Sequence, residues 1–140
     1  MKLSKALKLK NKLVSEVNTA MLYVTQHNST EEGTPRVYPV KEKLAEAMEK
    51  TTQLVELKAK IHKANLPVWE KVFRMSELKG MVSKLKSLDT RERTASPNGY
   101  RDAVTAEITL SEKDSLVKEL EEAIEAIQEE LDHHNHTTEV

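Results

Sequence analysis

Cysteine is absent from this chain of 140 residues, and glycine, proline and aromatic residues are scarce. Without cysteine the protein cannot form a disulfide, a thiolate zinc site, an iron–sulfur cluster or a cysteine nucleophile. Only 4% of the residues are aromatic, whereas 32% are charged, which is typical of long solvated helices and disfavours a β-sandwich or an α/β enzyme. No apolar run approaches the ~20 residues of a membrane helix, so the sequence predicts no membrane partner.

The net charge of -1 is small, but the charges are unevenly distributed. Residues 1–13 contain five lysines and no acid, whereas residues 112–140 contain ten acids and two lysines. The balanced total predicts no nucleic-acid partner. The early lysines also interrupt any apolar segment of a secretory signal, so we expect a cytoplasmic protein. The opposite charges predict that the first and last helices lie close together.

Two long helices are expected in the first half of the chain, over residues 3–26 and 40–64. Residues 27–39 between them contain Asn28, Gly33, Pro35 and Pro39 and predict a polar loop. The prediction of both helices is based on apolar positions that recur at steps of three and four residues. These positions include Leu3, Ala6, Leu13, Val17, Ala20 and Val24 in the first helix and Leu44, Ala47, Leu54 and Ile61 in the second.

The middle of the chain gives weaker signals. Residues 68–73 alternate in the manner of a short extended segment and contain Trp69 and Phe73. Ser76 is a candidate cap for a third helix, because apolar residues follow it at helical spacing. A polar loop is expected over residues 89–103.

The last quarter of the chain predicts a short strand over residues 104–110 and then a fourth helix over residues 112–133. Ser111 and Asp114 approximate a capping box at the start of that helix. The fold class expected for residues 1–140 is therefore a single all-α domain. It resembles a four-helix bundle of long amphipathic helices, with short β elements in the middle and before the last helix.

Several stretches together resemble a family of small bacterial helical proteins, some of which are labelled septicolysin. The resemblance rests on short segments in a shared order: Met1-Lys2-Leu3 with Ala6-Leu7, Glu32-Gly33 with Pro35, Ile61 followed by Asn65, Glu107-Ile108, and Asn135. None of these segments is a chemical motif. The resemblance therefore implies a helical fold and supplies no catalytic or binding residues.

The histidine-rich end, residues 132–136, is the first candidate for a functional site. Glu129 with His133, or Glu130 with His134, are four residues apart on a helix and could share a metal ion. However, His133 and His134 point about 100° apart on a helix, so they cannot both join one face. We therefore predict no metal-ligating residues.

The acidic last helix is the second candidate. Its carboxylates are similar to the two acidic half-motifs with which all-α nucleotide pyrophosphohydrolases hold magnesium. In those enzymes the half-motifs lie on separate helices and converge, whereas here all the acids follow one another on a single helix. We therefore predict a solvated helix face and no catalytic residues. The acids concerned are Glu121, Glu122, Glu125, Glu129 and Asp132.

The evidence for a nucleic-acid-binding loop or for a catalytic nucleophile is weaker still. Arg91, Arg93 and Arg101 occur near Tyr100, but this is too little basic and aromatic surface to predict nucleic-acid binding. No serine lies in a Gly-x-Ser-x-Gly elbow.

The function predicted from the sequence is a non-enzymatic interaction or assembly protein without a cofactor, which forms a homo-oligomer through its amphipathic helices. Long amphipathic helices cannot bury their apolar stripes alone, and they must pack on one another or on a second chain. The alternative is a metal-dependent all-α hydrolase similar to the nucleotide pyrophosphohydrolases, or a metal-binding protein, using the acidic last helix and the histidine-rich end.

Overall fold

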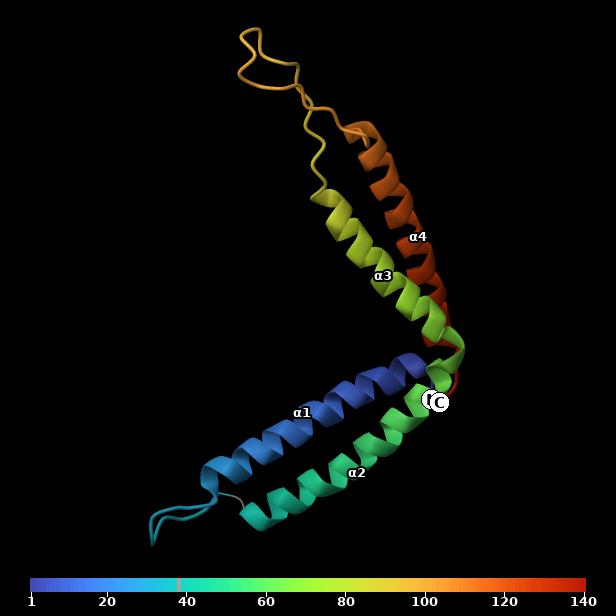
Figure 1. Ribbon diagram of the computed structural model, residues 1–140. Helices are drawn as coiled ribbons and strands as arrows, with labels where there is room; N and C mark the ends of the chain where they lie inside the picture. The colour runs from blue at the N-terminus through green and yellow to red at the C-terminus, as the bar shows by residue number, and fades with distance from the viewer. Residues whose placement is uncertain (38) are drawn as a thin grey trace. The chain divides into compact units, whose positions relative to one another are not determined.

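The computed structural model describes residues 1–37 and 39–140, and over these residues the protein is all-helical (Figure 1). Within this part of the chain the only extended pairings are two isolated antiparallel bridges, Lys2 with Glu139 and Arg93 with Val104. The all-α class is thereby confirmed. The elements are α1 (Leu3–His27), α2 (Val40–Asn65), the short 3-10 helix η1 (Leu66–Val68), α3 (Trp69–Lys86) and α4 (Leu110–Thr137).

The chain divides into two compact units, which we describe separately. The first consists of Met1–Pro67 and His133–Val140, and the second is Val68–Asp132. None of the helices in the described part of the chain has the length and apolar character that a membrane span requires.

The first unit is a hairpin in which α1 and α2 run side by side (Figure 1). The predicted stripe is confirmed on α1, where Leu3, Ala6, Leu13 and Ala20 are buried. Ala47, Leu57 and Ile61 are buried on α2, and Leu3, Ala6, Leu13, Leu57 and Ile61 form one core cluster. Both helices extend one residue beyond their predicted ends at residues 26 and 64.

The start of α1 is completed by residues from the other end of the chain. Lys2 offers no side-chain cap, and the first turn of α1 contains no acid to offset the helix dipole. Instead, the backbone N–H of Leu3 donates to the carbonyl of Thr138 at 2.8 Å, and the N–H of Val140 donates to the carbonyl of Met1 at 2.9 Å. The Glu139 carboxylate lies 2.6 Å from Lys2 Nζ and brings a negative charge to this helix end.

The second unit pairs α3 with the greater part of α4 (Figure 1). Lys71 binds Glu130 at 2.9 Å and Lys86 binds Glu121 at 3.0 Å, so the two helices run antiparallel. Lys113 Nζ also donates to the Lys86 carbonyl at 3.0 Å, near the end of α3. Val68, Val82 and Leu131 are buried, but most of the apolar seam is only half-buried, including Leu78, Leu85, Val117, Leu120, Ile124 and Ile127.

The prediction of an extended segment over residues 68–73 is wrong. The 3-10 helix η1 joins α2 directly to α3, which begins at Trp69, and Ser76 lies inside α3 instead of capping it. The short alternation is also compatible with a helix, because Val68, Val72, Met75, Val82 and Leu85 recur at helical spacing and lie on the less exposed side. Trp69 is half-buried and stacks on Phe73, with ring centroids 5.6 Å apart, but Phe73 itself is 62% exposed.

The region before α4 also differs from the predicted strand over residues 104–110. Val104 forms only the isolated bridge with Arg93, and α4 begins at Leu110. Thr109, and not Ser111, caps the helix, because its Oγ1 accepts the backbone N–H of Glu112 at 3.2 Å. The helix continues to Thr137, four residues beyond its predicted end.

The two predicted polar loops lie between helices. The loop over 89–103 has neither helix nor strand beyond the bridge at Arg93. In the loop over 27–39, residue 38 lies outside the described residues. Among the others, Arg36 donates to the carbonyls of His27 and Asn28 at the end of α1.

Candidate functional site

The histidine-rich end of α4 has a structural contact in the first unit. His134 Nε2 lies 3.1 Å from the carbonyl oxygen of Ala64, and its Nδ1 lies 3.1 Å from the Thr138 hydroxyl. A carbonyl can only accept, so Nε2 donates to the Ala64 carbonyl. His134 thereby satisfies one of the carbonyls that the end of α2 leaves without a helical partner.

One of the two residue pairs that the sequence offers as metal ligands, Glu130 with His134, is engaged in other contacts. Both ring nitrogens of His134 are engaged, and its partner Glu130 binds Lys71. His133 and Glu129 remain exposed on α4. Across residues 1–37 and 39–140, no group of three histidine, aspartate or glutamate side chains is close enough to hold a metal ion.

The acids of the second candidate all lie along α4, as the sequence predicts. Glu121 pairs with Lys86 of α3, and Asp132 accepts a hydrogen bond from Gln128 one turn earlier at 2.9 Å. Glu122, Glu125 and Glu129 are exposed. The carboxylates therefore serve helix pairing and solvation, and α3 contributes lysines to this surface.

The arginine-containing loop has an ordered hydrogen-bonded turn. Ser96 and Arg101 are joined by a backbone hydrogen bond of 3.0 Å, and Gly99 takes a positive φ of 70° inside this turn. Tyr100 is 87% exposed at its tip. Arg91 binds Asp89 at 2.9 Å at the base of the loop.

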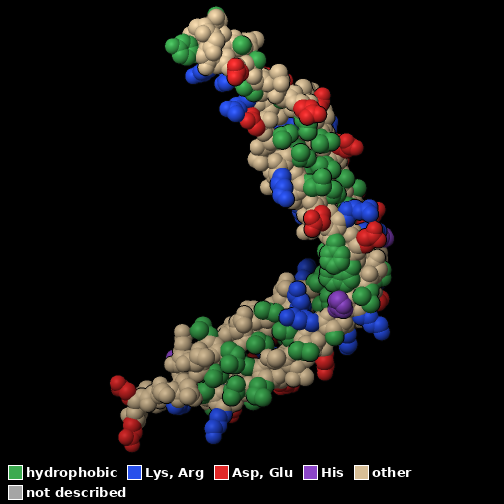
Figure 2. All heavy atoms as spheres, in the orientation of Figure 1, with side chains coloured by type: hydrophobic (Ala, Val, Ile, Leu, Met, Phe, Trp, Pro, Cys, Tyr) green, Lys and Arg blue, Asp and Glu red, His purple; other side chains and the backbone are tan. Residues whose placement is uncertain are grey.

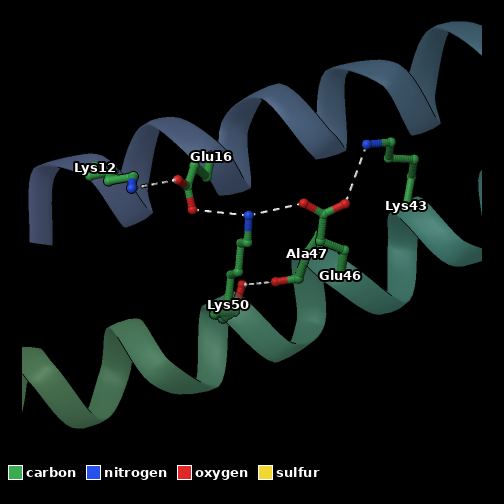
Figure 3. Close-up of polar contacts among 7 residues, drawn as sticks. Lys12, Glu16, Lys43, Glu46, Ala47 and Lys50 are labelled. Carbon is green, nitrogen blue, oxygen red and sulfur yellow. Dashed lines mark hydrogen bonds and ion pairs between the residues drawn. The ribbon is translucent and has the colours of Figure 1, made fainter. Parts of the chain in front are cut away.

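A charge ladder crosses from α1 to α2 in the first unit, and Figure 3 shows it. Lys50 of α2 lies between two carboxylates, 2.9 Å from Glu16 of α1 and 2.9 Å from Glu46 of α2. Lys12 extends the ladder to Glu16 at 3.8 Å, and Lys43 extends it to Glu46 at 3.3 Å. Alternating signs keep every charge beside an opposite one.

The ladder shifts the titration of its members in the direction expected for ion pairs. The hydrogen bond from Lys50 holds the pKa of both the Glu16 and the Glu46 carboxyls below their ordinary value of 4.5. The same pair of carboxylates, Glu46 first, raises the pKa of Lys50 above 10.5. All three groups therefore remain charged at neutral pH.

A groove of about 300 Å³ lies beside the ladder, lined by Ser15, Glu16, Thr19, Ala20, Tyr23, Lys43, Glu46 and Lys50. Its lysines and carboxylates already bind one another. A ligand at this position would have to compete with ion pairs that link α1 to α2. These side chains are therefore better suited to holding the two helices together than to binding or converting a ligand.

The second half of α1 carries little charge, and the side of the hairpin away from the ladder exposes several apolar residues. Between Leu13 and His27, α1 has a single charged residue, Glu16, and that residue belongs to the ladder. We define the neutral face as the exposed apolar residues of this side: Met21 on α1, with Leu44, Met48 and Val55 on α2. A second groove, of about 290 Å³, opens between Met21 and Met48, with Ala47, Thr51 and Thr52 as the other lining residues.

Neither the ladder nor the neutral face was identified from the sequence. The available signals were a run of α1 with one charge and three charged residues of α2 spaced at three and four. Each pattern indicates a surface only when the pairing of α1 with α2 is known.

Comparisons of the chain with protein-family models, curated proteins and solved structures gave no match. The septicolysin-like resemblance therefore stays a hypothesis based on short segments. Function must be argued from the contacts and surfaces of the two units alone.

Proposed function

We propose that this chain is a non-enzymatic assembly protein that self-associates through the apolar faces of its helical hairpins, in the cytoplasm, without a nucleic-acid, membrane or cofactor partner. The observation that carries this proposal is the apolar surface left exposed on each unit. Met48 and Val55 on α2 are 64% and 61% exposed, and Met81 on α3 is 51% exposed.

A hairpin of two helices can cover only one stripe of each helix. The seam between α3 and α4 is therefore largely half-buried, and Figure 2 shows hydrophobic side chains at the surface of both hairpins. Exposed apolar patches of this kind commonly mark interaction sites. Packing two hairpins from different copies would generate the four-helix bundle that the helix pattern suggests.

Assembly is favoured over the metal-dependent hydrolase by how the acids are used. Glu121 and Glu130 bind lysines of α3, and the remaining acids spread along α4. A hydrolase of this class needs carboxylates that converge on a cation.

Sedimentation velocity over a wide range of protein concentration tests the proposal. We expect a larger species that grows with concentration and dissociates on dilution. A single monomeric species at every concentration would remove the proposal. In parallel, dialysed protein is assayed for nucleotide hydrolysis with and without added magnesium, and we expect no divalent-dependent activity.

A further inference from the structure

We infer that the lysine-rich end of the α1–α2 hairpin binds the acidic face of α4 from a second copy of this chain. The lysine-rich end consists of residues 1–13 at the start of α1 and 57–65 at the end of α2, and the acidic face consists of Glu122, Glu125 and Glu129. This inference deepens the proposed function and rests on it, because it names two surfaces that determine how the copies meet. Charged groups in an interface govern its specificity more than its affinity, so the exposed apolar residues supply the remaining binding energy.

The lysine-rich end carries a concentrated positive charge. Its two segments contain eight lysines and no acid. They lie against each other, because Leu3 and Leu13 from the first segment belong to the same core cluster as Leu57 from the second. The lysines are therefore gathered at one end of the hairpin, where they produce a positive field that attracts an acidic partner.

Carboxylates of the same hairpin neutralise only part of this charge. Lys2 lies 2.6 Å from Glu139, and Lys12 belongs to the charge ladder. For Lys5 and Lys8, residues 1–37 and 39–140 provide no ion pair, and both lysines are exposed. These side chains are accessible to the carboxylates of another molecule.

Helix α4 offers the complementary charge. It contains nine acids and two lysines. Glu121 and Glu130 bind lysines of α3, whereas the glutamates of the acidic face are exposed and have no ion pair in the described part of the chain. Steps of three and four residues place Glu122, Glu125 and Glu129 together, roughly opposite the seam with α3. The acidic face therefore remains open when α4 is packed on α3.

The two surfaces also match in the spacing of their charges. Lys5, Lys8 and Lys12 are separated by three and four residues, as are the three glutamates of the acidic face. At 1.5 Å per residue, each set covers about 10.5 Å of helix. When the two helices lie side by side in either direction, successive charges of one set meet those of the other within about 2 Å along the axis. One contact can therefore form three ion pairs.

A second copy fits the lysine-rich end better than other polyanions do. Neither of its segments contains an aromatic residue that could stack on a nucleic-acid base. Leu3 and Leu13 are buried, so the start of α1 does not turn its apolar stripe toward a lipid surface. The acidic face, in contrast, is present at the same concentration as the lysines, because both belong to one chain.

Sedimentation velocity with two charge-reversed variants of the full chain tests the inference. Lys5→Glu with Lys8→Glu reverses the lysine-rich end, and Glu125→Lys with Glu129→Lys reverses the acidic face. All four side chains are exposed, so neither variant removes a core residue. We expect each variant alone to raise the dissociation constant at least about tenfold. An equimolar mixture of the two should associate as wild type does, because each altered surface then meets its complement on the other variant.

Lys41→Glu with Lys79→Glu is the matched control. It changes the net charge by the same amount, at exposed lysines of α2 and α3 that lie outside the lysine-rich end. The control should change the dissociation constant less than about twofold. For wild type, raising the salt concentration from about 0.05 M to about 0.5 M should weaken association, because screening shortens the reach of exposed charges.

The outcomes separate this inference from the proposed function. If wild type associates but neither salt nor the two charge-reversed variants weaken it, assembly through the apolar faces stands and only the inference fails. The inference also fails if the control weakens association as much as the variants do, or if the mixture does not recover it. A wild type that stays monomeric at every concentration overturns both. Binding of a fluorescent single-stranded oligonucleotide through the same lysines would then identify nucleic acid as the partner.

Discussion

The α1–α2 hairpin and the α3–α4 hairpin are built from helices of similar kind, yet they bury very different amounts of apolar side chain. Of the ten buried apolar residues in the described part of the chain, seven belong to the first unit and three, Val68, Val82 and Leu131, belong to the second. In the first unit the core cluster reaches complete burial at Leu3 and Ala6. In the second, the positions that face the partner helix are mostly half-buried.

The difference arises from what closes each hairpin. In the first unit the C-terminal residues cover the start of α1, through Thr138 and Glu139, and His134 closes the end of α2. A third segment thus shields the two helices at one end. In the second unit the described contacts between α3 and α4 are ion pairs and a lysine bond to a carbonyl at the edges of the seam. Such exposed ion pairs help to determine which helices pack together but contribute little to the free energy of folding.

The largest expected effect that tests this difference in burial comes from truncating one leucine in each hairpin. Leu3→Ala removes a side chain that is 0% exposed and should lower the free energy of unfolding by about 2–5 kcal/mol. Leu85→Ala, in the half-buried seam of the second unit, should cost about 1 kcal/mol. Urea unfolding followed by far-UV circular dichroism measures both. Equal losses would show that the two hairpins are equally well packed.

A smaller change in stability, of opposite sign, is expected from a substitution in the second unit. Gly80 lies inside α3, and a Cβ added there would meet no atom within 4 Å. Gly80→Ala should therefore raise the stability of this hairpin by about 0.5–1 kcal/mol, because alanine loses less backbone entropy on folding. The midpoint of urea unfolding should increase.

Gly99→Ala is the matched control for this change. Gly99 has a φ of 70°, which an L-residue with a Cβ adopts with strain, so the substitution should not stabilise the protein. A rise in midpoint for both variants would point to a general effect of alanine and not to the helix of α3.

The helices of the first unit could be predicted from the sequence because their signals are long and consistent. The spacing of Leu3, Ala6, Leu13 and Ala20 extends over the whole of α1, and the breakers after His27 are strong. A pattern that persists for five or more turns leaves little room for another structure.

Short or distant signals could not be resolved in the same way. The six alternating residues 68–73 are compatible with a strand or a helix, and Thr109 and Ser111 are equally good caps by composition. The contact of Lys2 with Glu139 joins the two ends of the chain, and local patterns carry no information about it. The charge asymmetry predicted that the first and last helices approach each other. The charged groups that meet there are Lys2, with Glu139 and the Thr137 carbonyl, and the Met1 amino group with Glu139, while acids of α4 pair with α3.

The smallest expected effect concerns the charge ladder and its dependence on pH. Glu16 and Glu46 have folded-state pKa values below 4.5, the ordinary value that they regain on unfolding. Above 4.5 both states are ionised and the contribution to stability is fully present. As the pH falls through 4.5 and then through the lower folded-state values, the unfolded state takes up protons first, so the contribution is lost.

Glu16→Gln with Glu46→Gln should therefore reduce the loss of stability that acid causes, measured as the change in urea midpoint between neutral and acidic buffer. Glu49→Gln is the control, since the described residues provide no ion pair for that exposed acid on the same helix. Added salt should also narrow the difference between wild type and the double variant at neutral pH, because screening weakens exposed pairs. If the double variant loses as much stability in acid as wild type does, the ladder does not stabilise the first hairpin. Its deeper burial would then account for the whole difference between the two units.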